Sequence, residues 1–382
     1  MTKGRIWAVI GAVAVCVAVW AVFDHLGSRN EPIYGGNRMS YWVKRTNYVP
    51  SIDLGMHGEG GFNQREAAFH ALRAIGTPAV PALCKIVENS KMKWDRRWRA
   101  VETLGEIGPP AKGASGSLIR ALNDPTFPSA NRYCIVVSLA AIGAAGECAP
   151  DLSEFLEKRH AETPLSNSGS ADFDQFQAIT VLGATGGYTA AAVPVLVKML
   201  GVYRKAIDDP KDATLPARPE ERKWAEESRE QLRTALVQAL GKLGAVDSKA
   251  QQAVMDSRND PSARVRIYVA EALVRFGKSD EALPLLDALA DDPDVRSRRM
   301  VIEVLGVLSK MQSAASLPRL VKMLGDKDDQ VRWLAVEKLG DMGGAAESAL
   351  DALKALAQDK SERVRRDAQA AMGKIDGGAK GR

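Results

Sequence analysis

The side chains that most often bind metal ions or attack substrates are few in this sequence and follow no catalytic pattern. The four histidines, His25, His57, His70 and His160, include no pair spaced four apart with a glutamate beside it, as a helical zinc site requires. The glycine-rich run 55–61 lacks the Lys-Ser/Thr of a phosphate-binding loop. These residues predict no metal site, no cofactor site and no catalytic residue, and hence a protein that is not an enzyme.

Cysteine chemistry is also sparse. The chain has four cysteines in 382 residues, too few for a scaffold held by disulfides. Outside the apolar amino-terminal segment these are Cys84, Cys134 and Cys148, and no Cys-x-x-Cys pair occurs. We expect buried thiols, and the alternative is a Cys134–Cys148 bridge in an oxidising compartment.

Arginine is the side chain that recurs at regular spacing. It fills eight of nine equivalent positions, and Gln175 fills the ninth. Six residues before four of these arginines lies an aspartate, which is suited to cap the following helix and to accept hydrogen bonds from an arginine of its own or a neighbouring repeat. The predicted arginine ladder consists of Arg65, Arg97, Arg132, Arg233, Arg266, Arg298, Arg332 and Arg365 with Asp260, Asp292, Asp326 and Asp359.

A helix-ending phrase close to Leu-Gly-x-x-Gly accompanies each of these positions. The nine copies end at residues 76, 108, 143, 186, 244, 277, 309, 343 and 376. Six of the eight spacings lie between 32 and 35 residues, which is the sign of a repeat architecture. Each unit predicts a helix A with proline in its first turn, a turn carrying aspartate, and a helix B carrying arginine and ending at a glycine C-cap.

The pattern resembles the HEAT family, in its short bacterial form known as PBS-lyase-like HEAT repeats. The residues that carry the resemblance are the helix A proline, the turn aspartate, the Val-Arg pairs such as Val331-Arg332, and the closing Leu-Gly-x-x-Gly. The resemblance covers about residues 38–376 and implies an all-α fold, a HEAT-like α-solenoid of about nine helix pairs in which neighbouring pairs share one core. Repeat 4 departs from the pattern at Gln175 and lacks the turn aspartate.

The amino terminus predicts a membrane segment. After a short cytoplasmic stretch, residues 1–5, the run 6–23 holds eighteen residues without a charge and would span about 27 Å as a helix. Lys3 and Arg5 before it favour a cytoplasmic amino terminus, and so a solenoid outside the cytoplasm. The alternatives are a cleaved signal peptide, which would give a secreted or periplasmic protein, and a lipoprotein acylated at Cys16.

The remaining boundaries follow from composition. Residues 24–37 predict a linker, and the solenoid is expected over 38–376, with residues 34–45 supplying a capping helix A for repeat 1. Two polar insertions are expected within it, at 157–173 and 201–223, and residues 377–382 predict a flexible tail.

Two rows of side chains on the B helices are candidates for binding a partner, because the resemblance implies that helix B lines the concave face. The row one residue after each arginine position includes Trp98, Tyr133 and Phe176, which suggest an aromatic strip for a protein or peptide partner. The alternative is that these three rings fill the core. The row four residues further on carries four glutamates and no lysine or arginine, namely Glu102, Glu271, Glu303 and Glu337.

These rows and the composition bear on the partner. The chain has 52 basic and 47 acidic residues, a net charge of +5, so composition does not indicate a nucleic-acid-binding protein, and an acidic row argues against one. Near Trp98, the run 94–99 leaves Arg96 and Arg99 as apparently free charges. We therefore expect a membrane-anchored HEAT-repeat scaffold of a bacterial inner membrane that binds protein partners. The alternatives are a lyase-like or glycosylase-like HEAT enzyme or its accessory subunit, and a self-associating structural protein of the envelope.

Overall fold

The chain forms stacked helix pairs in two compact units, Met1–Cys148 and Ala149–Arg382, each of which is described by itself. The computed structural model describes residues 31–47, 59–162, 169–185, 191–207, 216, 218–245, 247–311 and 314–380. The predicted membrane segment, residues 6–23, lies outside them. Within the described residues no helix is long and apolar enough to span a membrane.

The described part of the first unit begins with a small hairpin. Strand β1 (Ile33–Tyr34) pairs antiparallel with β2 (Asn37–Arg38), and Gly35 and Gly36 form the turn with positive φ angles of 53° and 76°. Trp42 of the next helix, α2 (Met39–Arg45), donates an indole hydrogen bond to the Tyr34 carbonyl at 3.1 Å. The prediction of a linker up to residue 37 was therefore wrong for residues 33–37, and within the described residues the fold is all-α except for this hairpin.

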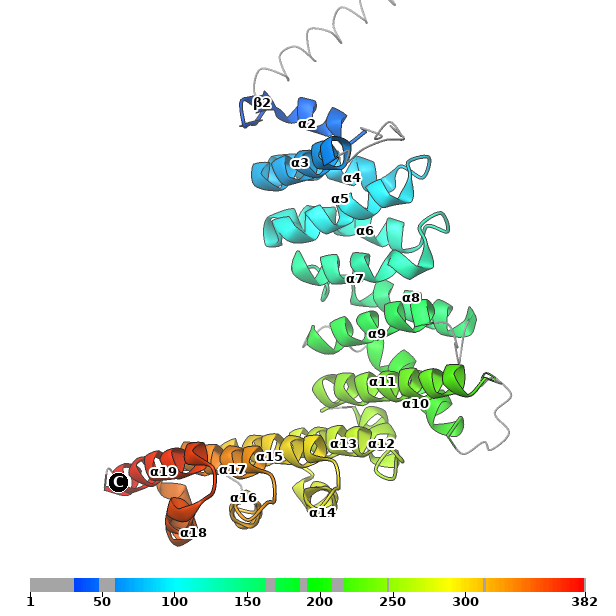
Figure 1. Cartoon of the computed structure of the whole chain (residues 1–382). Helices are drawn as coiled ribbons and strands as arrows, with labels where there is room; N and C mark the ends of the chain where they lie inside the picture. Colours follow the sequence, from blue (N-terminus) through cyan, green and yellow to red (C-terminus); the bar gives the residue numbers. More distant parts are fainter. Residues whose placement is uncertain are drawn as a thin grey trace, which may run out of the picture. The chain divides into compact units, whose positions relative to one another are not determined.

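The rest of the first unit consists of antiparallel helices whose pairs stack on one another (Figure 1). They follow the predicted order, with α2 preceding the B helix of repeat 1 as a cap. Their bounds are α3 (Glu59–Ile75), α4 (Val80–Glu88), α5 (Trp94–Ile107), α6 (Ser115–Leu122) and α7 (Arg132–Ala141).

The second unit continues the same alternation. In Figure 1 the B helices α13, α15, α17 and α19 lie side by side in one row, and α14, α16 and α18 form a second row against them. The bounds are α8 (Ala149–Glu162), α9 (Gly169–Ala184), α10 (Ala192–Lys205), α11 (Pro219–Leu243), α12 (Ser248–Asp256), α13 (Ala263–Arg275), α14 (Ser279–Ala290), α15 (Val295–Lys310), α16 (Ser316–Met323), α17 (Asp329–Met342), α18 (Leu350–Ala355) and α19 (Glu362–Lys380).

Three predicted boundaries were wrong because the flanking helices are longer than the repeat pattern suggests. Helix α8 continues to Glu162 and α9 begins at Gly169, so much of the expected insertion 157–173 is helical. Similarly, α10 and α11 extend into the expected insertion 201–223 from its two ends. The expected tail from 377 is helical through Lys380.

The recurring glycines serve two purposes, of which the sequence predicts only one. The last glycine of the phrase ends its helix with a positive φ, as at Gly143 and Gly277. The first glycine instead permits two B helices to touch: a Cβ on Gly183 would lie 2.9 Å from the Ala239 Cα, and one on Gly241 only 2.7 Å from the Ala272 Cβ. The repeated small residue is therefore a packing requirement between neighbouring repeats.

Candidate functional site

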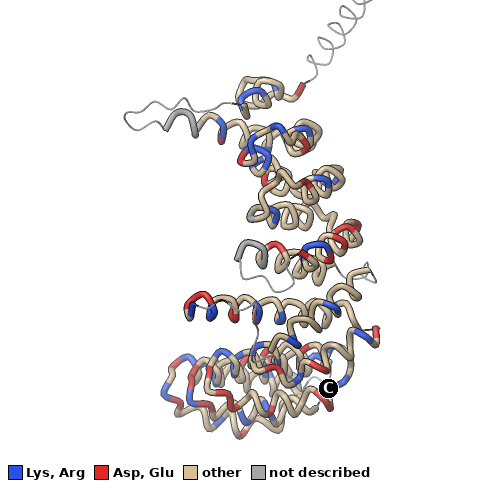
Figure 2. Tube along the Cα trace, turned by 90° about the vertical axis from the view of Figure 1, so that its right-hand side faces the viewer, with Lys and Arg blue, Asp and Glu red and all other residues tan. Residues whose placement is uncertain are grey.

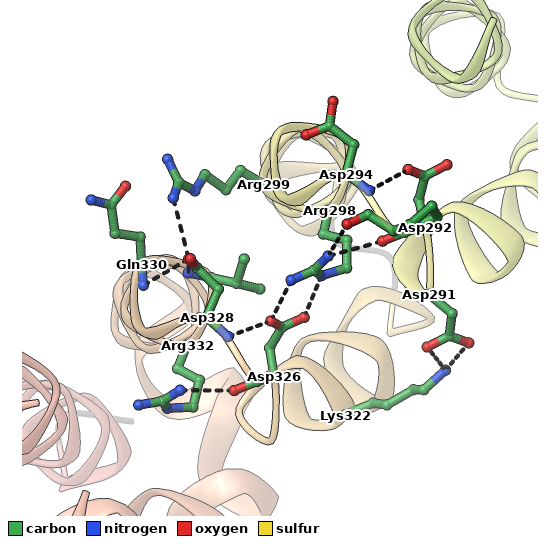
Figure 3. A network of polar contacts seen from close by, with 12 residues as sticks. Asp291, Asp292, Asp294, Arg298, Arg299, Lys322, Asp326, Asp328, Gln330 and Arg332 are labelled. Carbon is green, nitrogen blue, oxygen red and sulfur yellow. Dashed lines mark hydrogen bonds and ion pairs between the residues drawn. The ribbon is translucent and has the colours of Figure 1, made fainter. Parts of the chain in front are cut away.

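Five of the eight ladder arginines join one repeat to the next through an ion pair. Arg298 of α15 donates from Nε and Nη2 to the two carboxylate oxygens of Asp326 at 2.8 and 2.9 Å, and from Nη1 to the Asp292 carbonyl at 2.9 Å (Figure 3). Arg332 forms the same fork with Asp359, both bonds being 2.7 Å. One guanidinium thus holds its own turn and the turn of the following repeat.

Three further rungs pair an arginine with a carboxylate of the next repeat, and two of them use carboxylates that the sequence analysis missed. Arg233 pairs with Asp260 at 2.8 Å. In the first unit, Arg65 pairs with Asp95 at 2.8 Å and Arg97 pairs with Asp124 at 2.6 Å. The signal that identifies them is a carboxylate 27–30 residues after the arginine, rather than six before it.

The other predicted arginines bind carbonyls of their own turns. Arg266 donates to the Asp260 carbonyl at 2.7 Å, and Arg365 donates to the Asp359 carbonyl at 2.6 Å. Arg132 donates to the Asp124 carbonyl at 3.2 Å. In repeat 4, where Gln175 stands in place of arginine, Arg159 of α8 instead pairs with the buried Asp174 of α9 at 3.2 Å.

The ladder aspartates organise their turns but are not the helix caps. Asp326 accepts the backbone N–H of Asp328 at 2.8 Å, and it is Asp328 that caps α17. Burial would raise the pKa of Asp326, but hydrogen bonds from Arg298 and the Asp328 N–H lower it below its usual value. The Arg332 hydrogen bonds likewise lower the pKa of Asp359. These groups are ionised and satisfied, so they hold the repeats together and offer no ligand site.

The glutamate row is not an acidic ridge, because each member lies beside a cation from another row. Glu102 pairs with Arg99 at 2.9 Å, and Glu271 pairs with Arg275 at 2.8 Å. Lys338 lies 2.9 Å from Glu303 and 3.7 Å from Glu337. Figure 2 shows acidic and basic residues interleaved along these helices. The expected excess of negative charge was therefore wrong, and it gives no argument about nucleic acid.

The basic run of α5 is also engaged within the protein. Arg99 forms an ion pair with Glu66 at 2.6 Å, and Arg96 donates to the Thr46 hydroxyl at 2.9 Å. The expectation of a free charge was therefore wrong for Arg99, whereas Arg96 has a hydrogen bond but no ion pair among the described residues.

Each of the three aromatic residues of the predicted strip is half-buried. Trp98 and Tyr133 belong to the first unit and Phe176 belongs to the second. The Trp98 indole N–H is buried with no hydrogen-bond partner among the described residues. The three rings are thus divided between the two units, and no continuous strip is assigned to them.

Phe176 lies in a small aromatic pocket between α9 and α11. The cavity measures about 210 Å³, and we call it the aromatic pocket. From α9 come Phe173 and Phe176, one helical turn apart. From α11 comes one face with spacing i, i+3, i+4, i+7 and i+8, namely Trp224, Glu227, Ser228, Gln231 and Leu232.

Two rings of the aromatic pocket are unusually exposed for their size. Phe173 is 43% exposed and Trp224 is 46% exposed. Sequence analysis missed both rings. Phe173 is the last residue of the predicted polar insertion 157–173, and Trp224 directly follows the predicted insertion 201–223. Helical periodicity over residues 219–232 could have identified Trp224, because it places Trp224 on the same helical face as Leu232.

The remaining chemistry-bearing side chains form no second site. His160 is buried against Tyr203. Burial is the larger cause that lowers the pKa of its imidazole, and the nearby charge of Lys198 is the smaller one. Among the described residues no disulfide joins Cys84, Cys134 and Cys148, so the alternative Cys134–Cys148 bridge is absent. Among the described residues no group of three or more His, Cys, Asp or Glu is placed to hold a metal ion.

Comparison with solved structures indicates the fold. The importin beta structure in an ammonium sulfate condition is 15% identical to this chain with a TM-score of 0.59, covering 90% of this chain and 46% of that one. The karyopherin Kap121p, bound to the extreme carboxyl terminus of the protein phosphatase Cdc14p, is 14% identical with a TM-score of 0.47, covering 91% and 39%. The chain thus spans less than half the length of these karyopherins. Human deoxyhypusine hydroxylase in complex with glycerol is 21% identical with a TM-score of 0.29, covering 79% and 97%.

Sequence comparison indicates the family. No curated protein matches the chain. The family model for HEAT repeats matches residues 222–306 and 282–373, which include the ladder from Arg233 to Asp359. The chain is therefore an importin-like α-solenoid in fold, and its residues 222–373 match the HEAT-repeat family.

Proposed function

We propose that this protein is a non-enzymatic scaffold that binds a protein partner through the aromatic pocket of α9 and α11. The observation that carries the proposal is the pairing of a cavity with two large, half-exposed rings, Phe173 and Trp224. Aromatic side chains around a small pocket are the usual anchors of protein interfaces.

The size of the aromatic pocket favours a protein partner over a small molecule. Ligand sites usually enclose about 300–1,000 Å³, whereas this cavity of about 210 Å³ accommodates a single side chain. A surrounding interface would supply the rest of the contact. The proposal assigns the chain no catalytic step, metal or cofactor.

The proposal places this scaffold at a membrane. Residues 6–23 are the anchor, and Lys3 and Arg5 keep the amino terminus in the cytoplasm of a bacterial cell, with the solenoid on the outer side of the inner membrane. The full chain should then resist extraction from membranes by alkaline carbonate, and a variant lacking residues 1–30 should be released. Release of both, with a shortened amino terminus found by mass spectrometry, would indicate a cleaved signal instead.

Partner capture tests the proposed interface. The amount of partner recovered with a full-length Trp224→Ala variant should be at least about tenfold lower than with the wild-type chain. Truncating a hot-spot residue costs about 2 kcal/mol of binding free energy or more. Trp94→Ala is the matched control, because Trp94 is 47% exposed and does not line the aromatic pocket. Equal recovery by the two variants would contradict the proposal.

A further inference from the structure

The lining of the aromatic pocket combines rings with a carboxylate. Phe173, Phe176 and Trp224 supply three rings, and Glu227 supplies the charge. Ser228 and Gln231 add a hydroxyl and an amide, and among the described residues no lysine or arginine lines the wall. The rings have electron-rich faces that attract cations, and a carboxylate adds direct Coulomb attraction.

We propose that the aromatic pocket selects a cationic side chain, a lysine or an arginine, of an extended segment of the protein partner. This inference rests on the proposed function and names the residue that the pocket recognises. The cation would lie against the Trp224 and phenylalanine rings and donate hydrogen bonds to Glu227.

An apolar side chain suits this cavity less well. It would cover Glu227, Ser228 and Gln231 without offering them hydrogen bonds, and burying unpaired polar groups weakens binding. A lysine ammonium or arginine guanidinium supplies donors for these groups while its methylene stem packs against the rings.

Glu227 is available for such a partner. Its ion pair with Lys223 is long, at 4.0 Å, and joins two side chains that are 57% and 79% exposed. Pairs of this kind contribute little to stability, so an incoming cation can replace Lys223. Lys223 also lines a second cavity of about 660 Å³, together with Arg222 and Arg229, and Glu227 borders both cavities.

Fluorine NMR of the full-length chain in detergent micelles, labelled with 5-fluorotryptophan, tests the inference. The Trp224 signal is assigned as the one missing from a Trp224→Phe variant. The probes are two capped pentapeptides, Gly-Gly-Lys-Gly-Gly and the same peptide with neutral norleucine in place of lysine, titrated at constant ionic strength.

The expected result is a saturable shift of the Trp224 signal with the lysine peptide, at an affinity about tenfold higher than with the norleucine peptide. Glu227→Gln should weaken binding of the lysine peptide about fivefold or more. The matched control is Glu226→Gln, because Glu226 belongs to the second cavity and not to the aromatic pocket. It should leave binding within about twofold.

Three outcomes would overturn the inference: equal or stronger binding of the norleucine peptide, no response to either peptide, or equal effects of the two glutamine variants. Preference for norleucine would leave the proposed function intact, with the aromatic pocket as an apolar anchor. Failure of the proposed function shows separately, as unchanged partner recovery by Trp224→Ala.

Discussion

At the scale of single residues, the ladder arginines act as connectors whose geometry matters more than their charge. The Arg298 side chain is 3% exposed, and three of its nitrogens have fixed acceptors. Lysine has one nitrogen and cannot bind the Asp326 carboxylate and the Asp292 carbonyl in the same planar fork. Each rung therefore depends on arginine specifically.

Replacing one connector tests this. Arg298→Lys should lower the free energy of unfolding by about 1–3 kcal/mol, because it leaves buried acceptors unpaired. Arg296→Lys is the control, since the Arg296 side chain is 83% exposed. Urea unfolding and hydrogen exchange of α15 and α17 would measure the change. Equal stability of the two variants would show that charge alone suffices.

The lowered pKa of Asp359 gives a prediction with a definite sign. Because its pKa is lower in the folded chain than in the unfolded chain, the unfolded chain takes up the proton first as pH falls. The stability contributed by the Arg332–Asp359 pair is thus complete above the ordinary aspartate pKa of about 4, and acid removes it.

Comparison of Asp359→Asn with the wild-type chain measures that contribution. The variant should be less stable by about 2 kcal/mol at pH 7, and the difference should shrink as pH falls through the lowered pKa. Urea unfolding across this range provides the measurement. A difference that stays constant down to pH 3 would mean that ionisation of Asp359 is irrelevant to the rung.

Sequence could predict part of this residue-level chemistry. Eight arginines at one register position indicate a common task, and the turn aspartates supply an acceptor for it. The search for an aspartate six residues before each arginine could not find Asp95 and Asp124, because their turns differ in length. What these pairs share with the Arg233–Asp260 pair is a separation of 27–30 residues between the arginine and the following aspartate. Likewise, the pairing of Glu303 and Glu337 with Lys338 depends on how neighbouring helices stack, which no single repeat encodes.

At the scale of elements, the first glycine of the helix-ending phrase lets neighbouring B helices approach closely at Gly105, Gly183 and Gly241. A methyl group at Gly183 would meet the Ala239 backbone, which cannot move aside as a flexible side chain would. Gly201 of α10 is helical too, but a Cβ there would have nothing within 4 Å. Comparing substitutions at Gly183 and Gly201 therefore distinguishes the effect of helix packing from the effect of helix propensity.

Alanine at these two positions should act in opposite directions. Gly183→Ala should destabilise the chain by about 1–3 kcal/mol, because the overlap forces α9 and α11 apart. Gly201→Ala should stabilise it by about 0.5–1 kcal/mol through helix propensity. Thermal unfolding of both variants would measure this. A stabilising effect at Gly183 would contradict the close contact.

The elements show where prediction from the repeat pattern ends. The period places helix centres well, because the apolar core positions lie there. It does not place helix ends, and α8, α9, α10 and α11 all run past the expected limits. The aromatic pocket was missed for this reason: Phe173 and Trp224 belong to helical extensions outside the repeat register.

At the scale of the whole molecule, the regular repeats mainly bind one another, and we propose that the irregular repeats bind the partner. The ladder and the glycine contacts recur in both units and are satisfied internally. The aromatic pocket lies where repeats 4 and 5 depart most from the repeat pattern. Specificity for a partner is therefore expected at the irregular repeats.

Site-specific photo-crosslinking in the native cell tests this claim most directly. With p-benzoylphenylalanine at position 173 of the full-length chain, the account predicts one dominant protein adduct, whose attachment point maps by mass spectrometry next to a lysine or arginine and which Trp224→Ala abolishes. The same group at position 94 should give no such adduct. Identical adducts from positions 94 and 173, or none from position 173, would contradict the account.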